Sequence, residues 1–350
     1  MASLSSDLLL VGDIGGTKTD LLILSVAQGI SAPLARARLK SAAYPDLQSL
    51  LREFLKTAGF AVKHACLDVA GPVVDGHAHL TNLPWEVDAA VLREELGFIS
   101  IDILNDLAAI AHAIPVLTAQ DARALNPEHN AATGTKAVIA PGTGLGEAFL
   151  VWDGQHYRPC PSEGGHADFA PPTEALAGLI PYLRQRLDHV SYEIVCSGVG
   201  IPHLYDYFRC QAPTRESVVF ARSLAASLDR TPLIIERALQ TDDPTDLCRV
   251  AMEAFLTILA AEAGNLALKV LALGGVYIAG GIPPRLLTLL NTEEFLRVFC
   301  AKGRFAALLS RIPVWLITNP DVALIGCAAH GLERLQAQAP GHPPEDPKPR

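Results

Sequence analysis

The first residues in the chain that could carry out chemistry form a glycine turn near its start. Residues 8–24 read LLLVGDIGGTKTDLLIL, in which two apolar runs flank the segment from Gly12 to Lys18. Apolar runs around a glycine pair predict a β-hairpin. Because Gly15 and Gly16 have no Cβ, the turn can approach a ligand closely, and its successive N–H groups can bind phosphate. Asp13, where the first run ends, would hold a hydrated magnesium ion beside that phosphate.

The same turn also has a simpler interpretation. A Gly-Gly pair between two strands is common in tight turns that bind nothing. The standard nucleotide motifs do not decide the matter, because Thr17 occupies the place of the second glycine of GxxxxGK[ST] and a strand is expected where that motif needs a helix. The turn alone therefore leaves both interpretations open.

Three further segments place a glycine turn or a carboxylate at the end of an apolar run. They are Asn105-Asp106, Gly142-Thr143-Gly144 and Gly280-Gly281. Ligands of open sheets bind beyond the ends of strands. Two glycine turns from different domains would hold the two ends of a triphosphate, and the third would let the adenosine approach the backbone. Taken together, the four segments favour nucleotide binding.

Asp106 has two possible roles. Residues 107–112 look helical, and Asp is a favoured N-cap, so spacing alone favours a cap. In a sugar kinase the same carboxylate would accept the proton of the hydroxyl that attacks the γ-phosphorus. The two roles need different partners, so one side chain cannot fill both fully.

The sequence Glu163-Gly164-Gly165-His166 brings a carboxylate and an imidazole to one glycine bend. Such a pair suits a ligand with many hydroxyl groups, such as a sugar. The alternatives are a surface acid with a structural histidine, or a metal site, but no Cys/His pair with zinc spacing follows. Glu193 is expected to begin another helix, where it would be a solvated acid.

These residues need strands and helices to position them. After the first hairpin, the patterns predict strands at 34–39, 65–69 and 101–104 and helices at 46–57 and 87–96. The hairpin pattern then restarts, with strands at 137–139, 146–152, 156–158, 275–279 and 314–317, helices between 173 and 273, and a last helix at 322–335. This order predicts mixed sheets in two similar domains that face one cleft.

Composition excludes several classes of protein. Of the 350 residues, 50% are apolar and 19% charged, which indicates a globular chain, and the net charge of −9 argues against nucleic-acid binding. The seven cysteines form no CxxC pair and indicate free thiols in a reducing cytoplasm. No signal peptide is evident, and the apolar window 256–273 carries Glu262, Asn265 and Lys269, which favours a buried helix over a membrane span.

The chain resembles the bacterial glucokinase family of the hexokinase/actin-like ATPase superfamily. The resemblance is carried by GDIGGTKT at 12–19, TNLPW at 81–85, ILNDLAAIAHAIP at 103–115, GTGLG at 142–146, EGGHADFAP at 163–171, CSGVGIPHLY at 196–205, GGVYIAGGIPPRLL at 274–287 and KGRF at 302–305. It implies an α/β fold of two RNase H-like domains with mixed five-stranded sheets around a central cleft. We expect a small domain of residues 1–115 joined by a helix at 318–336, a large domain of residues 116–317, and a disordered tail at 337–350.

The resemblance also implies an ATP-dependent glucokinase that phosphorylates D-glucose at the 6-hydroxyl, the first step of glycolysis, with Mg²⁺. It implies that Asp106 is the general base and that the glucose ligands are Asn105, Asp106, Glu163, His166 and Glu193. It implies that ATP is bound by Gly12, Asp13, Ile14, Gly15, Gly16, Thr17, Gly142, Thr143, Gly144, Gly280 and Gly281. Asp13 would bind magnesium through water. We expect a cytoplasmic homodimer that binds neither nucleic acid nor membranes.

The sequence departs from the family pattern in places. Lys18 stands where many members carry Asn, and Pro141 removes one N–H donor before the second phosphate turn. The cysteine-rich zinc motif of the related repressor/kinase family is missing after His166, so no zinc is expected. Three alternatives remain: a kinase of another hexose such as mannose or fructose, a glucose-binding regulator without turnover, and an actin-like filament protein. A regulator would need a DNA-binding segment ahead of Leu8, and a filament protein would not need the sugar-site residues.

Overall fold

The computed structural model describes residues 8–80, 83–126 and 133–337. By its internal contacts the chain divides into two compact units. The first unit runs up to Leu117 and resumes at Pro320, and the second runs from Thr118 to Asn319. The predicted disorder of the C-terminal tail falls almost entirely outside the described residues.

The first unit contains a mixed five-stranded sheet in the order β3-β2-β1-β4-β8. Its strands are β1 (Leu8–Ile14), β2 (Lys18–Ser25), β3 (Ala35–Lys40), β4 (His64–Val69) and β8 (Ser100–Asn105). β1, β2 and β3 form an antiparallel meander, whereas β4 and β8 run parallel to β1. Asp13 pairs with Asp68, and Val69 pairs with Asn105. The three parallel strands therefore end at the same edge of the sheet. The sheet therefore gathers the polar residues that follow these strands.

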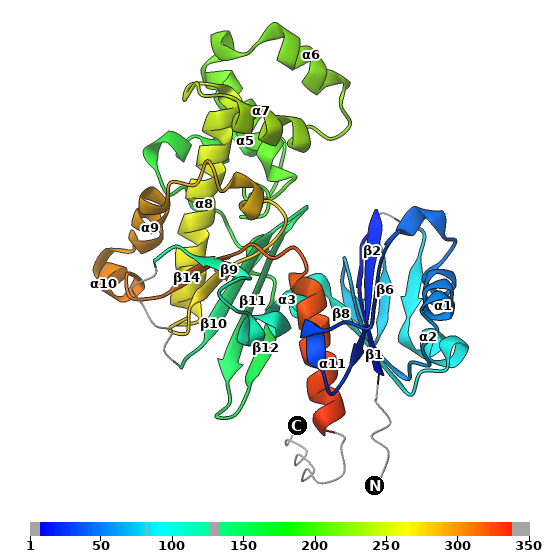
Figure 1. Cartoon of the computed structure of the whole chain (residues 1–350). Helices are drawn as coiled ribbons and strands as arrows, with labels where there is room; N and C mark the ends of the chain where they lie inside the picture. The colour runs from blue at the N-terminus through cyan, green and yellow to red at the C-terminus, as the bar shows by residue number, and fades with distance from the viewer. Residues whose placement is uncertain (1–7, 81–82, 127–132, 338–350) are drawn as a thin grey trace. The chain divides into compact units, whose positions relative to one another are not determined.

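Helices cover both faces of this sheet (Figure 1). α1 (Leu47–Ala58) and α2 (Ala89–Leu96) pack on one face, and α3 (Asp106–Ala113) and α11 (Val322–Ala337) lie on the other. α1 follows its sequence signals closely: Asp46 caps it by accepting from the Ser49 N–H, and Gly59 ends it at a φ of 72°. A small sheet of β5 (Val73–Val74), β6 (His77–His79) and β7 (Glu86–Asp88) was not predicted.

α3 and α11 approach so closely that Gly326 has no room for a side chain. A Cβ at this position would lie 1.6 Å from the carbonyl oxygen of Ala109. We expect Gly326→Ala to destabilise the protein by about 1–3 kcal/mol, although alanine gains roughly 1 kcal/mol in helix propensity. Denaturant unfolding would measure this. Gly331→Ala on the same helix is the control, since it meets the mobile end of Leu9 and should cost less; equal costs would contradict the backbone clash.

The second unit repeats the sheet order of the first. Its sheet runs β12-β11-β10-β13-β14-β9. The strands are β9 (Ala122–Ala124), β10 (Lys136–Pro141), β11 (Leu145–Trp152), β12 (Tyr157–Ser162), β13 (Val276–Ile278) and β14 (Val314–Ile317). β10, β11 and β12 are the antiparallel meander, and β13 and β14 continue parallel to β10. The predicted restart is confirmed, with β9 added as a sixth strand that is too short to be detected in the sequence.

Helices α5 (Gly200–Gln211), α7 (Thr231–Gln240) and α9 (Thr292–Cys300) pack against one long buried helix of the second unit, α8 (Leu247–Lys269) (Figure 1). The unit also contains α4 (Leu179–Leu183), α6 (Val218–Ala226) and α10 (Ala306–Leu309). By length and composition α8 is apolar enough to cross a membrane, but 72% of its apolar window is buried inside the unit. It is therefore a core helix, as the sequence indicated.

Candidate active site

The structure separates the cap of α3 from the candidate base. Asn105 is the N-cap, and its Oδ1 accepts a hydrogen bond of 2.7 Å from the Ala108 N–H. Asp106 is the first residue of the helix, and its Oδ1 accepts from the adjacent Leu107 N–H at 2.8 Å. The interpretation of Asp106 as the cap is therefore wrong, because the cap belongs to the residue before it.

The carboxylate of Asp106 lies at the sheet edge in a partly desolvated position. The residue is exposed, yet the surrounding protein atoms raise its pKa above the usual value, while the backbone hydrogen bonds at the helix start oppose the shift. A raised pKa makes the ionised carboxylate a stronger proton acceptor. Because Asn105 makes the cap, the carboxylate of Asp106 is available to act as a general base.

A second carboxylate, Asp13, shares this edge of the sheet. The pKa of Asp13 is raised to about 6, mainly by burial and then by the negative charges of Asp20 and Asp106, while the ammonium group of Lys18 opposes the shift. Asp68 on the neighbouring strand is fully buried, and its Oδ1 has no hydrogen-bond partner among the described residues. Burial and the charge of Asp13 raise its pKa well above the usual value.

This arrangement of carboxyl groups suits a hard cation that keeps most of its water. Among the described residues no three acidic, histidine or cysteine side chains form a complete metal cage. Mg²⁺ commonly binds through one or two carboxylates and retains several waters. The unpartnered oxygen of Asp68 and the raised pKa of Asp13 fit that mode. Sequence analysis missed Asp68, although a single acid within the apolar strand HACLDV was a usable signal.

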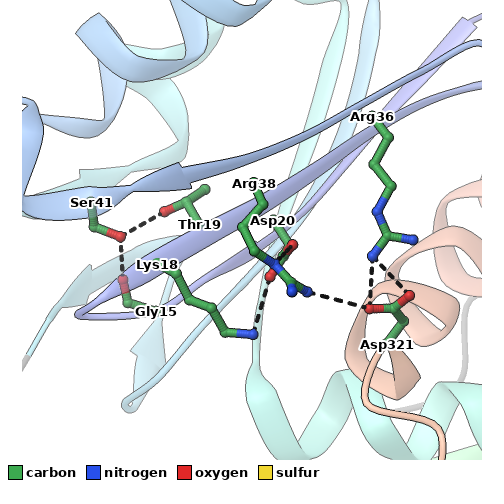
Figure 2. Close-up of polar contacts among 8 residues, drawn as sticks. All are labelled: Gly15, Lys18, Thr19, Asp20, Arg36, Arg38, Ser41 and Asp321. Atoms are coloured by element: carbon green, nitrogen blue, oxygen red, sulfur yellow. Dashed lines mark hydrogen bonds and ion pairs between the residues drawn. The ribbon is translucent and has the colours of Figure 1, made fainter.

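Side-chain and backbone contacts hold the first glycine turn (Figure 2). The Gly15 N–H donates to the Lys18 carbonyl at 3.0 Å, and the Ser41 hydroxyl donates to the Gly15 carbonyl at 2.6 Å. A Cβ on Gly15 would lie 2.8 Å from the Lys18 oxygen. Gly12 lies inside β1, where a Cβ would collide with two leucine side chains, and the side chain of Ile14 is in the core. Any contact from Ile14 to a ligand would therefore come from its backbone.

A series of ion pairs between neighbouring side chains lies beside this turn (Figure 2). Lys18 Nζ is 3.4 Å from the carboxylate of Asp20, which is nearly fully buried and also accepts from Arg38 Nε at 2.6 Å. Arg38 approaches Asp321, which binds Arg36 through both carboxylate oxygens. These ion pairs hold together the strands that flank the turn, and the ammonium group of Lys18 places a positive charge next to it.

The second and third glycine turns lie side by side in the second unit. In the second turn, the Gly142 N–H donates to the Gly144 carbonyl at 2.9 Å. Gly280, in the third turn, has a φ of 83°, and a Cβ there would lie 2.4 Å from the carbonyl oxygen of Pro141. Gly281 has open space in front of it. Two turns that are far apart in the sequence thus form one backbone-lined surface.

The second unit also brings together Glu163, His166 and Glu193, which we call the sugar clamp after the role that the resemblance implies for them. His166 Nε2 is 3.9 Å from a Glu163 oxygen, and its Nδ1 is 4.0 Å from a Glu193 oxygen. The side chain of Glu163 is 93% exposed and that of Glu193 25% exposed, so the clamp has an open and a sheltered side. The imidazole therefore lies between two carboxylates.

The expectation that Glu193 begins a helix is wrong. Residues 193–199 form turns, and the next helix, α5, begins at Gly200. The Glu193 N–H donates to the Gly165 carbonyl at 2.8 Å, and its Oε2 accepts from the Leu145 N–H at 3.0 Å. Glu193 thus links the sugar clamp to the end of the second glycine turn, and no local sequence signal shows this tertiary contact.

The predicted site residues fall into two groups. Asp13, Asn105 and Asp106 lie at one sheet edge of the first unit, together with the first glycine turn. The sugar clamp and the other two glycine turns lie in the second unit. Each unit brings its own group together.

We compared the whole chain with families and proteins that are already known. The family model described as Glucokinase matches residues 10–334. A glucokinase of Synechocystis sp. is 38% identical over 343 residues, with 91% of this chain and 96% of that protein covered. A glucokinase of Nostoc punctiforme is 40% identical over 336 residues, with 92% and 98% covered.

The chain belongs to the glucokinase family. A crystal structure of a glucokinase from an Antarctic psychrotroph superposes with a TM-score of 0.81 at 33% identity, covering 93% of this chain and 99% of that one. The predicted family and the α/β fold are confirmed, and the chain is an enzyme of the glucokinase type. Members of the family use ATP as the phosphoryl donor. The roles of individual site residues remain predictions, as does the homodimer.

Proposed function

We propose that this glucokinase family member transfers the γ-phosphoryl group of ATP to the 6-hydroxyl of D-glucose, which gives glucose 6-phosphate. The observation that carries the proposal is the division of roles at the start of α3. Asn105 caps the helix, and Asp106 is left to accept the proton of the attacking hydroxyl. The Asn105 side chain uses only its oxygen for the cap, so its NH₂ group can donate to a glucose hydroxyl.

The sugar clamp supports a polyhydroxylated substrate. Glu163 and Glu193 offer carboxylate oxygens that accept from hydroxyl groups, and the imidazole of His166 between them can accept or donate. Glu193 Oε2 is already engaged by the Leu145 N–H, which holds the carboxylate in place.

The three glycine turns are the proposed donor site. The turns at Gly12–Thr17 and Gly142–Gly144 would bind the phosphates through their N–H groups, and Gly280-Gly281 would accommodate the adenosine. Magnesium, when bound through water by Asp13, supplies positive charge to the transferring phosphoryl group. Lys18 lies beside the first turn and adds a positive charge there.

A panel of hexoses assayed with Mg-ATP tests the proposal. We expect glucose to give the highest kcat/KM, with mannose and fructose lower by about tenfold or more, because a misplaced hydroxyl leaves polar groups of the site without a hydrogen-bond partner. The rate of ADP production, measured at a series of concentrations of each sugar, gives these kcat/KM values. A preference for another hexose would replace glucose as the substrate, and glucose binding without turnover would favour a regulator.

A further inference from the structure

A buried carboxyl group lies directly beneath the loop that carries Glu163 and His166. Glu147, in β11, is only 1% exposed. A Cβ on Gly164 would lie 2.0 Å from its Oε2, so the loop backbone rests on this side chain. Ser162, which pairs with Glu147 across the strands, accepts a hydrogen bond from the Gly164 N–H at 3.0 Å. The carboxyl group of Glu147 thus packs directly against the backbone of the loop at Gly164.

A second buried acid, Glu262 on α8, lies near enough to Glu147 for its charge to act on this carboxyl group. Neither carboxylate oxygen of Glu147 receives a hydrogen bond from the described residues. Glu262 is fully buried but accepts from Lys269 Nζ at 3.0 Å and from Asn265 Nδ2 at 2.7 Å. Glu262 therefore has the donors that an ionised carboxylate needs, and Glu147 has none.

The pKa of Glu147 agrees with this asymmetry. Its pKa is raised to about 7, mainly by burial and then by the negative charge of Glu262, while Lys269 opposes the shift and a hydrogen bond with Glu262 adds to it. Two carboxyl groups can share a hydrogen bond only if one carries a proton. Because Glu262 already accepts from Asn265 and Lys269, we assign that proton to Glu147. Cys196 is also near this pair, and its own pKa is raised mainly by burial and then by the two acids.

The same network reaches the other segment of the sugar clamp. Asn265 Nδ2 donates to the hydroxyl of Tyr192 at 2.8 Å, and Lys302 Nζ donates to Asn265 Oδ1 at 2.6 Å. Tyr192 precedes Glu193, and its N–H donates to the Ala167 carbonyl at 3.0 Å. Groups on α8 therefore support both segments that carry the clamp.

We propose that Glu147 is a positioning residue of the sugar clamp, whose hydrogen shared with Glu262 keeps the loop seated so that Glu163 and His166 meet glucose. The inference rests on the proposed role of the sugar clamp. When this hydrogen is lost, two negative charges face each other in a buried site, and the Glu147 side chain must move or admit water beneath the loop. Glucose affinity then falls while the binding of ATP is maintained.

Glu147→Gln tests the inference, because glutamine has the same shape and its NH₂ group can donate to Glu262 at every pH. In the unmodified enzyme we expect the KM for glucose to rise by about threefold or more between pH 6 and pH 8, as Glu147 ionises. In Glu147→Gln this rise should shrink to less than about twofold, with the KM for ATP unchanged. Glu253→Gln, which removes an exposed acid from the same helix, is the matched control and should keep the rise.

Infrared spectroscopy gives a second measurement, which does not depend on activity. A carbonyl stretch of a buried protonated carboxyl group, assigned to Glu147 by its absence from Glu147→Gln, should be present at pH 6 and fade over the same pH range in which the KM for glucose rises. If the rise persists in Glu147→Gln, or if the two midpoints differ by more than about one pH unit, the inference is overturned. Failure of Glu163→Ala and His166→Ala to raise the KM for glucose would instead overturn the clamp itself.

Discussion

Asp106→Asn is expected to lower kcat by about 10²–10⁴-fold while the Kd for glucose changes by only a few-fold. Asparagine has the same shape but cannot accept the proton of the 6-hydroxyl. The helix start should survive, because the cap is made by Asn105 and not by the altered residue. A coupled assay of glucose 6-phosphate formation gives kcat, and calorimetry gives glucose binding. Asp106→Ala should behave in the same way.

Asp88→Asn is the matched control for this substitution. Asp88 is the N-cap of α2 in the same unit, and it accepts from the Ala90 and Val91 N–H groups. Asparagine caps a helix about as well as aspartate, so the same loss of charge should leave kcat unchanged. Turnover of Asp106→Asn close to that of the control would refute the assignment of the base.

The pH dependence of kcat gives a further check on Asp106. A general base must be ionised, so kcat falls as the pH drops through the pKa of Asp106 in the substrate-bound enzyme. Because desolvation raises the pKa of Asp106 in the protein, this loss should lie above pH 3.8, the ordinary value for aspartate. The acid limb should be absent from the residual activity of Asp106→Asn.

The second large effect is expected in the sugar clamp. Glu163→Ala or His166→Ala should raise the KM for glucose by about 10- to 100-fold, the range for the loss of a hydrogen bond to a charged group. The KM for ATP should change by less than about threefold, because the clamp contacts the sugar and not the donor. Initial rates with each substrate varied in turn separate the two values.

Glu163 is well suited to this test because its side chain is 93% exposed, so the protein should fold without it. Glu174→Ala, which removes an exposed acid from the same unit, is the control and should leave both KM values unchanged. Glu193 is a poorer choice, since it also binds the Leu145 N–H at the second glycine turn. If the KM for ATP rises as much as that for glucose, the clamp does not act on the sugar.

Local sequence signals predicted most of the strands and helices. Asp46 and Gly59 mark the ends of α1 in both the sequence and the structure. The two hairpins with glycine turns predicted mixed sheets in two similar domains, because a tight turn and two apolar runs specify a hairpin with few other contacts. Strand β9 and the small sheet of β5, β6 and β7 were missed, since segments this short carry no periodicity.

The sequence was less informative about individual side chains. It offered Asp106 as a cap or a base, and the hydrogen bond from Ala108 to Asn105 decided that the cap lies one residue earlier. It presented Glu193 as a solvated helix start, and the backbone contact with Gly165 placed it in the sugar clamp. It gave no reason to select Glu147, whose importance depends on an acid more than a hundred residues away.

By itself, the sequence determined the family, the alternation of strands and helices, and the set of residues able to carry out the chemistry. These depend on residue types, on periodicity and on short motifs, which act over a few neighbouring positions. Only the tertiary structure decided which carboxylates face each other, which of them have donors and which are desolvated. Those properties depend on distances between segments remote in the chain, and electrostatic and hydrogen-bond energies change steeply with such distances.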